Sequence, residues 1–598
     1  MRLPKKDPWH RRLLVMTATT LMGLLVVLGH LWYLQVFEGA RFRELSEKNR
    51  IRVRPIAAPR GILFDRNGLP LVDNRPAFTL SLIPAELPDA EAVLARLAAL
   101  LRIPYAELVE AVDRVPHDSF RPIRVRRGLT LEEVAKVEEW KLALPGVVVE
   151  VEPQRAYPGS RLAAHLLGYV REVSEDQLKQ GPYRPGDMVG QSGLERLLDD
   201  YLRGTDGSER IEVDALGRPV QSVGLREPQP GANVVTTIDR RIQEIAERAI
   251  GNRPGAVVVM DPRNGDILAM TSSPAFDLDQ FTGPLGRATW LRLVRDSRFP
   301  LLNRAFQGQY APGSIFKIVV ATAALQEGVI TPFERLGCPQ AIRLGRRTFR
   351  NWEDRGDIDV YEAIVRSCNT FFYQLGLKVG IDVIARYARA FGLGAPTGIA
   401  LPGEKPGLVP SRKWKRKRFG EPWRPGETAN VSIGQGHVLV TPLQIARLMA
   451  AVANGGVLWR PRLVQHVERA DGTLVYAEAN EVTGRVELSP AVWEFLRLSL
   501  WGVVNAGGTG RAARLPGLDV AGKTGTAQIR ARRKGAGGTD HAWFAGVAPA
   551  RDPEVVVVVL IERGGKGGRV AAPVAREIFQ RIFFERVAGL ARAGMGSS

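Results

Sequence analysis

Residues 309–317 (QYAPGSIFK) place a serine and a lysine three positions apart, Ser314 and Lys317. The mostly apolar run from Ile315 to Leu325 predicts a helix with Ser314 at its start, where hydroxyl side chains cap free backbone amides. Residues i and i+3 share a helix face, so the Lys317 amine can come within hydrogen-bonding distance of the Ser314 hydroxyl. A desolvated lysine with a lowered pKa can activate a serine as a nucleophile. The stretch is therefore a candidate nucleophile with its base.

A single S-x-x-K match is weak evidence, because chance produces one in a chain of this length and an ordinary capped helix looks the same. Two later motifs strengthen it: 367–369 (SCN) and 523–526 (KTGT), which follow Ser314 and Ser367 by 53 and 156 residues. This order is the signature of penicillin-binding proteins and class A β-lactamases. The triplet here has cysteine in the middle but keeps the hydroxyl and the amide that carry the chemistry. Together the three motifs predict an acyl-serine enzyme.

On these motifs the chain resembles the class B penicillin-binding proteins, and most of all the elongation type, penicillin-binding protein 2. The resemblance runs from about residue 10 to about residue 585. It implies a peptidoglycan D,D-transpeptidase that cross-links stem peptides through an acyl-serine intermediate during cell-wall elongation and is acylated by β-lactams. Further stretches that carry it are 58–68, 155–158, 193–195, 430–436, 527–528 and 541–546.

The resemblance assigns catalytic roles to five side chains. Ser314 attacks the carbonyl of the penultimate D-alanine, and Lys317 accepts its proton. Ser367 relays a proton towards the leaving amine. Asn369 binds Lys317 and the substrate amide, and Lys523 supplies positive charge beside the cleft.

Substrate contacts are implied for the residues that follow Lys523. Thr524 and Thr526 offer hydroxyls to the substrate carboxylate, and Gly525 permits close approach of a ligand backbone. The backbone amides of Ser314 and Thr526 would form the oxyanion hole. The seven histidines and two cysteines lack metal-ligand spacing, so no metal site or cofactor is expected.

The net charge of +20 predicts an anionic neighbour. No nucleic-acid-binding signature is present, so nucleic acid is not expected as a partner. Residues 412–418 (RKWKRKR) hold six bases. This run is either a solvated basic loop or a contact surface for an anionic glycan precursor or phospholipid headgroups.

Residues 13–37 contain no Asp, Glu, Lys or Arg and are long enough to span a bilayer. The apolar run is too long for a cleavable signal peptide, so an uncleaved single-pass anchor is predicted. Basic residues flank both ends and do not fix its orientation. The resemblance implies the orientation: residues 1–12 would form a cytoplasmic tail, and the catalytic part would lie on the periplasmic or extracellular side of the inner (cytoplasmic) membrane.

The length predicts several domains and, with the resemblance, a multi-domain α+β fold. Residues 38–235 would form a mixed pedestal (dimerisation-like) domain with a head at about 85–150. Residues 236–585 would form the transpeptidase domain, an antiparallel sheet flanked by helices, and 586–598 a flexible tail. Periodicity predicts strands at 78–84, 255–260, 266–270, 541–547 and 555–560, and helices at 89–101, from 129–134 onward and at 574–584.

Cys338 and Cys368 are the two cysteines of the chain. Their distance cannot be read from the sequence, and two packed thiols are favoured over a disulfide bridge.

The resemblance also implies partners: a SEDS-family glycosyltransferase in the membrane, elongasome scaffold proteins, and peptidoglycan stem peptides, with β-lactams as inhibitors. A second hypothesis remains open. The chain could be a penicillin-binding sensor or scaffold whose main task is to activate a glycan polymerase through the pedestal and anchor.

Overall fold

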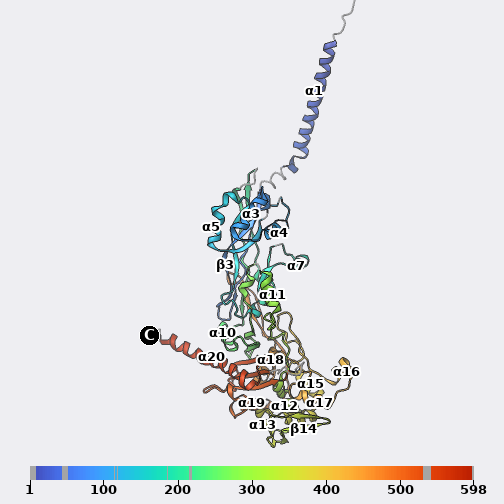
Figure 1. Cartoon of the computed structure of the whole chain (residues 1–598), viewed down its shortest axis with the longest axis vertical. Coiled ribbons are helices and arrows are strands. Elements are labelled where there is room, and N and C mark those ends of the chain that lie inside the picture. Colours follow the sequence, from blue (N-terminus) through green and yellow to red (C-terminus); the bar gives the residue numbers. More distant parts are fainter. Residues whose placement is uncertain are drawn as a thin grey trace, which may run out of the picture.

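The computed structural model describes residues 8–595 except 43–50, 114, 118, 121, 185, 215–218, 284 and 530–539. The molecule is elongated, with the N-terminal helix α1 at one end of its longest axis and the segment around β14 at the other (Figure 1). Helix α1 (Pro8–Trp32) continues into a π-helical turn, Tyr33–Phe37. Residues Trp9–Phe37 form a helix long and apolar enough to cross a membrane. The predicted tail lies largely outside the described residues, since the description begins at Pro8.

The pedestal is built on a seven-stranded sheet around the long strand β3 (Pro70–Leu82). Its strand order is β19-β18-β10-β2-β3-β4, and β5 also pairs with β3. Two of these strands, β18 (Val464–Glu468) and β19 (Leu474–Ala477), come from the C-terminal half of the chain. The pedestal and the catalytic part therefore share a sheet. The other strands are β2 (Leu63–Phe64), β4 (Ile123–Leu129), β5 (Val147–Ala156) and β10 (Asn233–Thr236).

A separate apolar core lies where three helices pack on one end of β3: α3 (Ala90–Leu101), α4 (Tyr105–Asp113) and α5 (Leu131–Glu139). Asp89 caps α3 by accepting a bond from Ala92 N, and Thr130 forms a capping box with Glu133. These caps explain why the helices begin where the sequence predicts.

The catalytic part is organised around a five-stranded antiparallel sheet of order β12-β11-β23-β22-β21. Alternate residues of one strand belong to different cores: Val556 and Val558 pack with the core that contains α12 and α18, while Val557 packs with α10 and α20. Side chains alternate across a strand, so helices cover both faces of the sheet. The strands are β11 (Gly255–Met260), β12 (Ile267–Ser273), β21 (Ala521–Ala527), β22 (His541–Ala548) and β23 (Val555–Ile561).

The covering helices are α10 (Arg240–Ile250), α12 (Lys317–Gln326), α18 (Pro442–Asn454) and α20 (Gly567–Met595). Helix α20 differs from the prediction at both ends. It begins before Pro573 instead of after it, and the expected flexible tail is helical as far as Met595. Apolar side chains such as Ala571 pack under the sheet ahead of the proline, which keeps the first turns helical.

The remaining elements complete the two parts. Further helices are α6 (Ala164–Leu167), α7 (Glu175–Gln180), α8 (Gly193–Leu197), α9 (Asp199–Leu202), α11 (Arg287–Arg295), α13 (Val360–Arg366), α14 (Asn369–Val379), α15 (Ile381–Ala390), α16 (Arg412–Phe419), α17 (Pro425–Ser432) and α19 (Pro490–Asn505). A three-stranded sheet has the order β1-β8-β9, made of β1 (Ile51–Ile56), β8 (Gly207–Val213) and β9 (Pro219–Arg226). Two-stranded sheets pair β6 (Val170–Glu172) with β7 (Met188–Gly190), β13 (Leu336–Gly337) with β16 (Asp357–Ile358), β14 (Ala341–Leu344) with β15 (Arg347–Arg350), and β17 (Val457–Trp459) with β20 (Val482–Arg485).

A buried ion cluster holds the base of the pedestal together. Glu195 is fully buried and accepts bonds from Arg60 Nε at 2.8 Å and Arg155 Nε at 2.6 Å. Arg60 also reaches Asp199 at 2.5 Å. Burial opposes ionisation of Glu195, but the two guanidinium groups outweigh it and keep the pKa of Glu195 below its ordinary value. The cluster ties together segments more than one hundred residues apart in sequence.

We expect Glu195→Ala to destabilise the protein by about 3–5 kcal/mol, because it leaves two buried guanidinium groups without their shared carboxylate. Urea unfolding of the purified full chain measures this. Glu138→Ala, which removes an exposed carboxylate paired with Lys141, is the matched control and should change stability by no more than about 1 kcal/mol. Equal effects of the two substitutions would show that the cluster is not structurally important.

Candidate active site

Ser314 lies in a single 3-10 turn, Gly313–Phe316, directly before α12. The N-cap of this turn is Pro312, and no side chain caps it, so the predicted capping role of Ser314 is wrong. Gly313 has φ +56°, and a Cβ there would lie 2.7 Å from the carbonyl oxygen of Thr526. The turn is therefore pressed against β21, and a glycine is required for that approach.

Lys317 begins α12 and is fully buried. Its Nζ lies 2.8 Å from the carbonyl oxygen of Ser367, 3.2 Å from Ser367 Oγ and 2.7 Å from Asn369 Oδ1. The hydrogen bonds of the described residues do not include one from Lys317 Nζ to Ser314 Oγ. The SCN triplet therefore orients Lys317, which lies one helix turn after Ser314.

The SCN triplet joins α13 to α14. Ser367 ends α13 with φ +56°, a left-handed conformation that non-glycine residues adopt mainly at constrained sites. Its Oγ also lies 3.1 Å from Lys523 Nζ. Ser367 therefore bridges the two lysine amines, and Asn369 completes the chain of bonds.

The KTG segment occupies β21, the edge strand of the sheet. Lys523 is fully buried, and Thr524 Oγ1 lies 2.7 Å from Thr509 Oγ1. A Cβ at Gly525 would lie 2.7 Å from the carbonyl oxygen of Pro312. The backbone that comes close to Gly525 is therefore that of the protein's own serine turn, whereas the sequence predicted the backbone of a ligand there. Thr526 Oγ1 accepts a bond from Gly567 N at 3.2 Å.

Burial shapes the charge of both lysines. Removal from water lowers the pKa of Lys317 well below its ordinary value, and the nearby Lys523 amine lowers it further. Burial lowers the pKa of Lys523 to about 7. A neutral amine can accept a proton, so the site contains a base beside a second amine that can carry charge near neutral pH.

Cys338 and Cys368 form a disulfide with Cα atoms 6.3 Å apart, so the preference for two packed thiols is wrong. Cys338 follows β13, and the chain folds back so that Asn351 lies beside both sulfurs. Asn351 Oδ1 accepts a bond from Asn369 N at 2.9 Å. The spacing of 30 residues gave no indication of this fold-back. The bridge ties the SCN triplet to the 336–358 segment.

Four contacts near these residues were not predicted. Asn351 supports Asn369, and Thr509 meets Thr524. Gln435 Nε2 lies 3.4 Å from the carbonyl oxygen of Thr526, and Trp543 Nε1 donates to the carbonyl of Ala311 at 3.1 Å. Gln435 and Trp543 fall in stretches that carry the family resemblance, and no other feature of the sequence pointed to these two residues.

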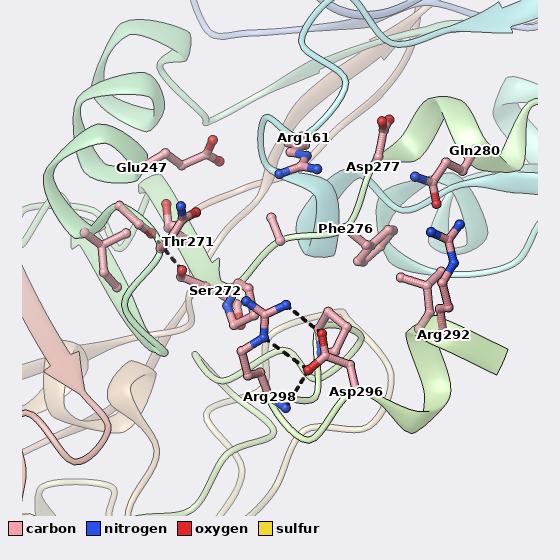
Figure 2. Close-up of a pocket in the computed structure, with 18 of the residues that line it drawn as sticks. Arg161, Glu247, Thr271, Ser272, Phe276, Asp277, Gln280, Arg292, Asp296 and Arg298 are labelled. Atoms are coloured by element: carbon pink, nitrogen blue, oxygen red, sulfur yellow. Dashed lines mark hydrogen bonds and ion pairs between the residues drawn. The ribbon is translucent and has the colours of Figure 1, made fainter. Parts of the chain in front are cut away.

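A cavity of about 560 Å³ lies apart from this constellation, between α10, the end of β12 and α11. Figure 2 shows Arg161 and Arg292 directed towards it, with Arg298 paired to Asp296. None of the eight predicted site residues lines it. The predicted site residues therefore lie outside this cavity.

Breaking the disulfide by Cys338→Ser with Cys368→Ser should lower stability by about 3–4 kcal/mol, the chain-entropy value for a loop of this size. Serine can still cap α14 in place of Cys368, which accepts a bond from Phe371 N. Urea unfolding with and without a reductant measures the effect. The chain has no other cysteine, so the reductant should destabilise the wild type and leave the double variant unchanged. A wild type indifferent to reductant would contradict a structural role for the bridge.

Comparison with known proteins agrees with this geometry. Residues 255–580 match the penicillin binding protein transpeptidase domain family, and residues 55–236 match the penicillin-binding protein dimerisation domain family. The peptidoglycan D,D-transpeptidase MrdA of Acinetobacter baumannii is 34% identical over 96% of this chain and 88% of its own length.

Two solved structures are similar along most of the chain. Penicillin-binding protein PBP2 of Helicobacter pylori, in a complex with MreC, is 27% identical with a TM-score of 0.76, covering 89% of this chain and 99% of that one. A chain from a structure titled "Structural coordination of polymerization and crosslinking by a peptidoglycan synthase complex" is 34% identical with a TM-score of 0.70, covering 95% of this chain and 98% of that one. This chain belongs to the penicillin-binding protein transpeptidase family.

Proposed function

We propose that the chain is a serine-type peptidoglycan D,D-transpeptidase of cell-wall elongation. The observation that carries this is the chain of bonds from Asn369 through Lys317 and Ser367 to Lys523, beside the Ser314 turn. The relatives named MrdA peptidoglycan D,D-transpeptidase support the same activity.

In the acylation step the hydroxyl of Ser314 attacks the carbonyl carbon of the penultimate D-alanine. Neutral Lys317 accepts the serine proton, since its buried amine favours the uncharged form. Ser367 lies within hydrogen-bonding distance of both amines and can pass a proton to the leaving D-alanine amine. Asn369 fixes Lys317 and offers its amide to the substrate backbone.

The developing oxyanion would be bound by the backbone amides of Ser314 and Thr526. The N–H groups of the first turn of a helix have no partner within it, which leaves the amide of Ser314 free to donate. In a strand the N–H and C=O of one residue point to the same edge. The carbonyl of Thr526 meets Gln435 on the open edge of β21, so its N–H faces that edge too. Loss of one such donor typically costs roughly 3–4 kcal/mol in transition-state stabilisation.

The substrate carboxylate would lie along the same edge. Lys523 supplies charge, and Thr524 and Thr526 supply hydroxyl groups. Gly525 leaves room for the serine turn, since a Cβ there would lie 2.7 Å from the carbonyl oxygen of Pro312. An amine of a second stem peptide then attacks the ester carbonyl, forms the cross-link and releases Ser314.

The location follows from the anchor and the disulfide. We place residues 1–12 in the cytoplasm, one span through the inner membrane, and the catalytic part on the periplasmic or extracellular side. The disulfide supports this side, because such bridges persist in oxidising compartments and are rare in the cytosol. It adds an argument that the charges flanking the anchor could not provide.

The partners would be a SEDS-family glycosyltransferase in the membrane, elongasome scaffold proteins and stem peptides, with β-lactams as inhibitors. The similarity to the PBP2 chain bound to MreC and to a chain of a peptidoglycan synthase complex supports partners of this kind. The alternative, a sensor or scaffold that mainly activates a polymerase, predicts a different outcome for the loss of Ser314.

Ser314→Ala should abolish covalent labelling by a fluorescent penicillin, because no other hydroxyl occupies the nucleophile position. Mass spectrometry of the wild-type digest should place the adduct on the peptide that contains Ser314. Ser174→Ala, which removes a cap of α7 on the pedestal, is the control and should label normally. In cells, S314A should leave glycan strands uncross-linked. A variant that still supports growth would favour the scaffold alternative.

The kcat/KM for acylation by a carboxylate-bearing β-lactam should fall about tenfold per pH unit above about pH 7, because it reports the free enzyme and Lys523 loses its charge there. Lys523→Arg keeps the charge at all accessible pH values. The falling limb should therefore vanish in K523R even if the maximum rate is lower. Stopped-flow or gel-based acylation rates from pH 5.5 to about 9 measure both profiles. A falling limb shared by the two enzymes would assign it to another group.

A further inference from the structure

Two short segments of the catalytic part are strongly basic. Residues 341–350 and 412–418 together carry ten basic and no acidic side chains, against a net charge of +20 for the whole protein. The second segment is not a loop, as one reading of the sequence had it, but the helix α16.

The first segment is the hairpin β14–β15. Ile342 pairs with Phe349 across it, and this face packs against Tyr373 and Ala429. The opposite face carries Arg343 and Arg350, since cross-strand partners share a face and neighbours alternate.

Arg346 and Arg347 lie at the hairpin turn and are exposed as well. The salt bridges between described residues include none of the four hairpin arginines. Their charge is therefore available to a partner.

The second segment presents a similar surface. Lys415 is buried and bound to both oxygens of Glu427 at 2.7 Å, which fixes α16 against α17. Trp414 packs against His437 and Phe419 on the inner side. The other bases of the helix are exposed, and within the described chain only Arg412 has a carboxylate partner, Asp382 at 3.4 Å.

Both segments border α17, which leads to the Ser314 turn and β21. Ala429 of α17 packs under the hairpin, and Glu427 holds α16. Directly after α17, the carbonyl of Gly434 accepts a bond from Gly313 N, and Gln435 meets Thr526. The basic surface is thus separated from the nucleophile turn by a few residues of α17 and the chain that follows it.

The position of this surface in the molecule indicates which anion it binds. α16 and β14 lie in the catalytic part, far along the longest axis from α1 (Figure 1). A surface placed there cannot rest on the headgroups of the membrane that α1 enters, which removes the phospholipid alternative. The anion that must come to the candidate active site is the substrate polymer, whose stem peptides carry free carboxylates.

We propose that α16 and the β14–β15 hairpin form a docking surface for the carboxylates of a peptidoglycan strand. The inference rests on the proposed function and adds a second contact to it, outside the acylation site. Arginine presents a planar donor fork that matches carboxylates. Each arginine–carboxylate pair at a solvent-exposed surface is weak and is screened by salt. Binding of the strand therefore depends on several such pairs acting together. It holds the strand while the acyl-enzyme waits for its acceptor amine.

The test uses the full chain in detergent and co-sedimentation with purified insoluble peptidoglycan at low salt. Two triple variants reverse the charge of the surface: R343E/R346E/R350E and K413E/R416E/K417E. The matched control, R485E/R497E/R514E, reverses three exposed arginines of the catalytic part that belong to neither segment. We expect each surface variant to bind roughly tenfold or more weakly, the control to bind within about twofold of the wild type, and added salt to abolish the difference.

Two further arms identify the ligand. Peptidoglycan whose carboxyl groups have been amidated should no longer bind the wild type. Vesicles with anionic phospholipids should not discriminate the surface variants from the control. Equal binding of all variants to peptidoglycan, full binding of the amidated polymer, or a loss confined to vesicles would each overturn the proposal.

Labelling by fluorescent penicillin separates this inference from the proposed function. All charge variants should be acylated at the wild-type rate, because none of the substituted residues contacts the described catalytic bonds. Cross-linking of polymeric acceptor should show a raised KM with kcat nearly unchanged in the surface variants. Failure of the wild type to label would count against the transpeptidase assignment, while the sedimentation result would still decide the docking surface.

Discussion

The structure depends on the burial of two lysine amines on either side of one serine hydroxyl. Lys317 and Lys523 are both fully buried, and their Nζ atoms lie 3.2 and 3.1 Å from Ser367 Oγ. Two ammonium groups this close in a low-dielectric interior would repel strongly and would each lack water. Burial favours the neutral form of Lys317, whose hydrogen bonds to the described residues include no carboxylate. The same burial that makes the arrangement costly leaves Lys317 able to accept a proton.

Holding those amines in place requires segments that are far apart in sequence to meet with little freedom. The serine turn and β21 approach so closely that Gly313 and Gly525 both lack room for a Cβ. On the neighbouring strand β22, Trp543 donates a hydrogen bond to the carbonyl of Ala311 and so holds the serine turn in place. On the other side, the disulfide and Asn351 fix the triplet that contains Ser367 in its left-handed conformation. Each of these contacts limits the movement of a segment that surrounds the two lysines.

The sequence could predict what depends on local chemistry. Asp89 and Thr130 cap helices where an acidic or hydroxyl residue precedes an apolar period, and the runs around Val258 and Val558 are strands because they are apolar on both faces. The three motifs include Lys317, Ser367, Asn369 and Lys523, which the structure joins by hydrogen bonds. The disulfide could not be predicted, because the fold-back of the chain after Cys338 is set by tertiary packing. The start of α20 before Pro573 and the sharing of β18 with the pedestal sheet depend on tertiary packing in the same way.

The buried lysines of the site and the exposed arginines around α17 differ in their chemistry and so suit different roles. In the candidate site, burial can lower the pKa of a primary amine far enough for the amine to accept a proton, which a guanidinium cannot do. Outside it, most of the exposed bases around α17 are arginines, which stay charged whatever their surroundings and grip carboxylates in a fixed geometry. The outer charges are screened over roughly 8 Å at physiological salt, so they can attract an anionic strand without forcing a proton onto Lys317 or off Lys523. Attraction of the polymer and activation of the serine can therefore be tuned independently, although both rest on positive charge.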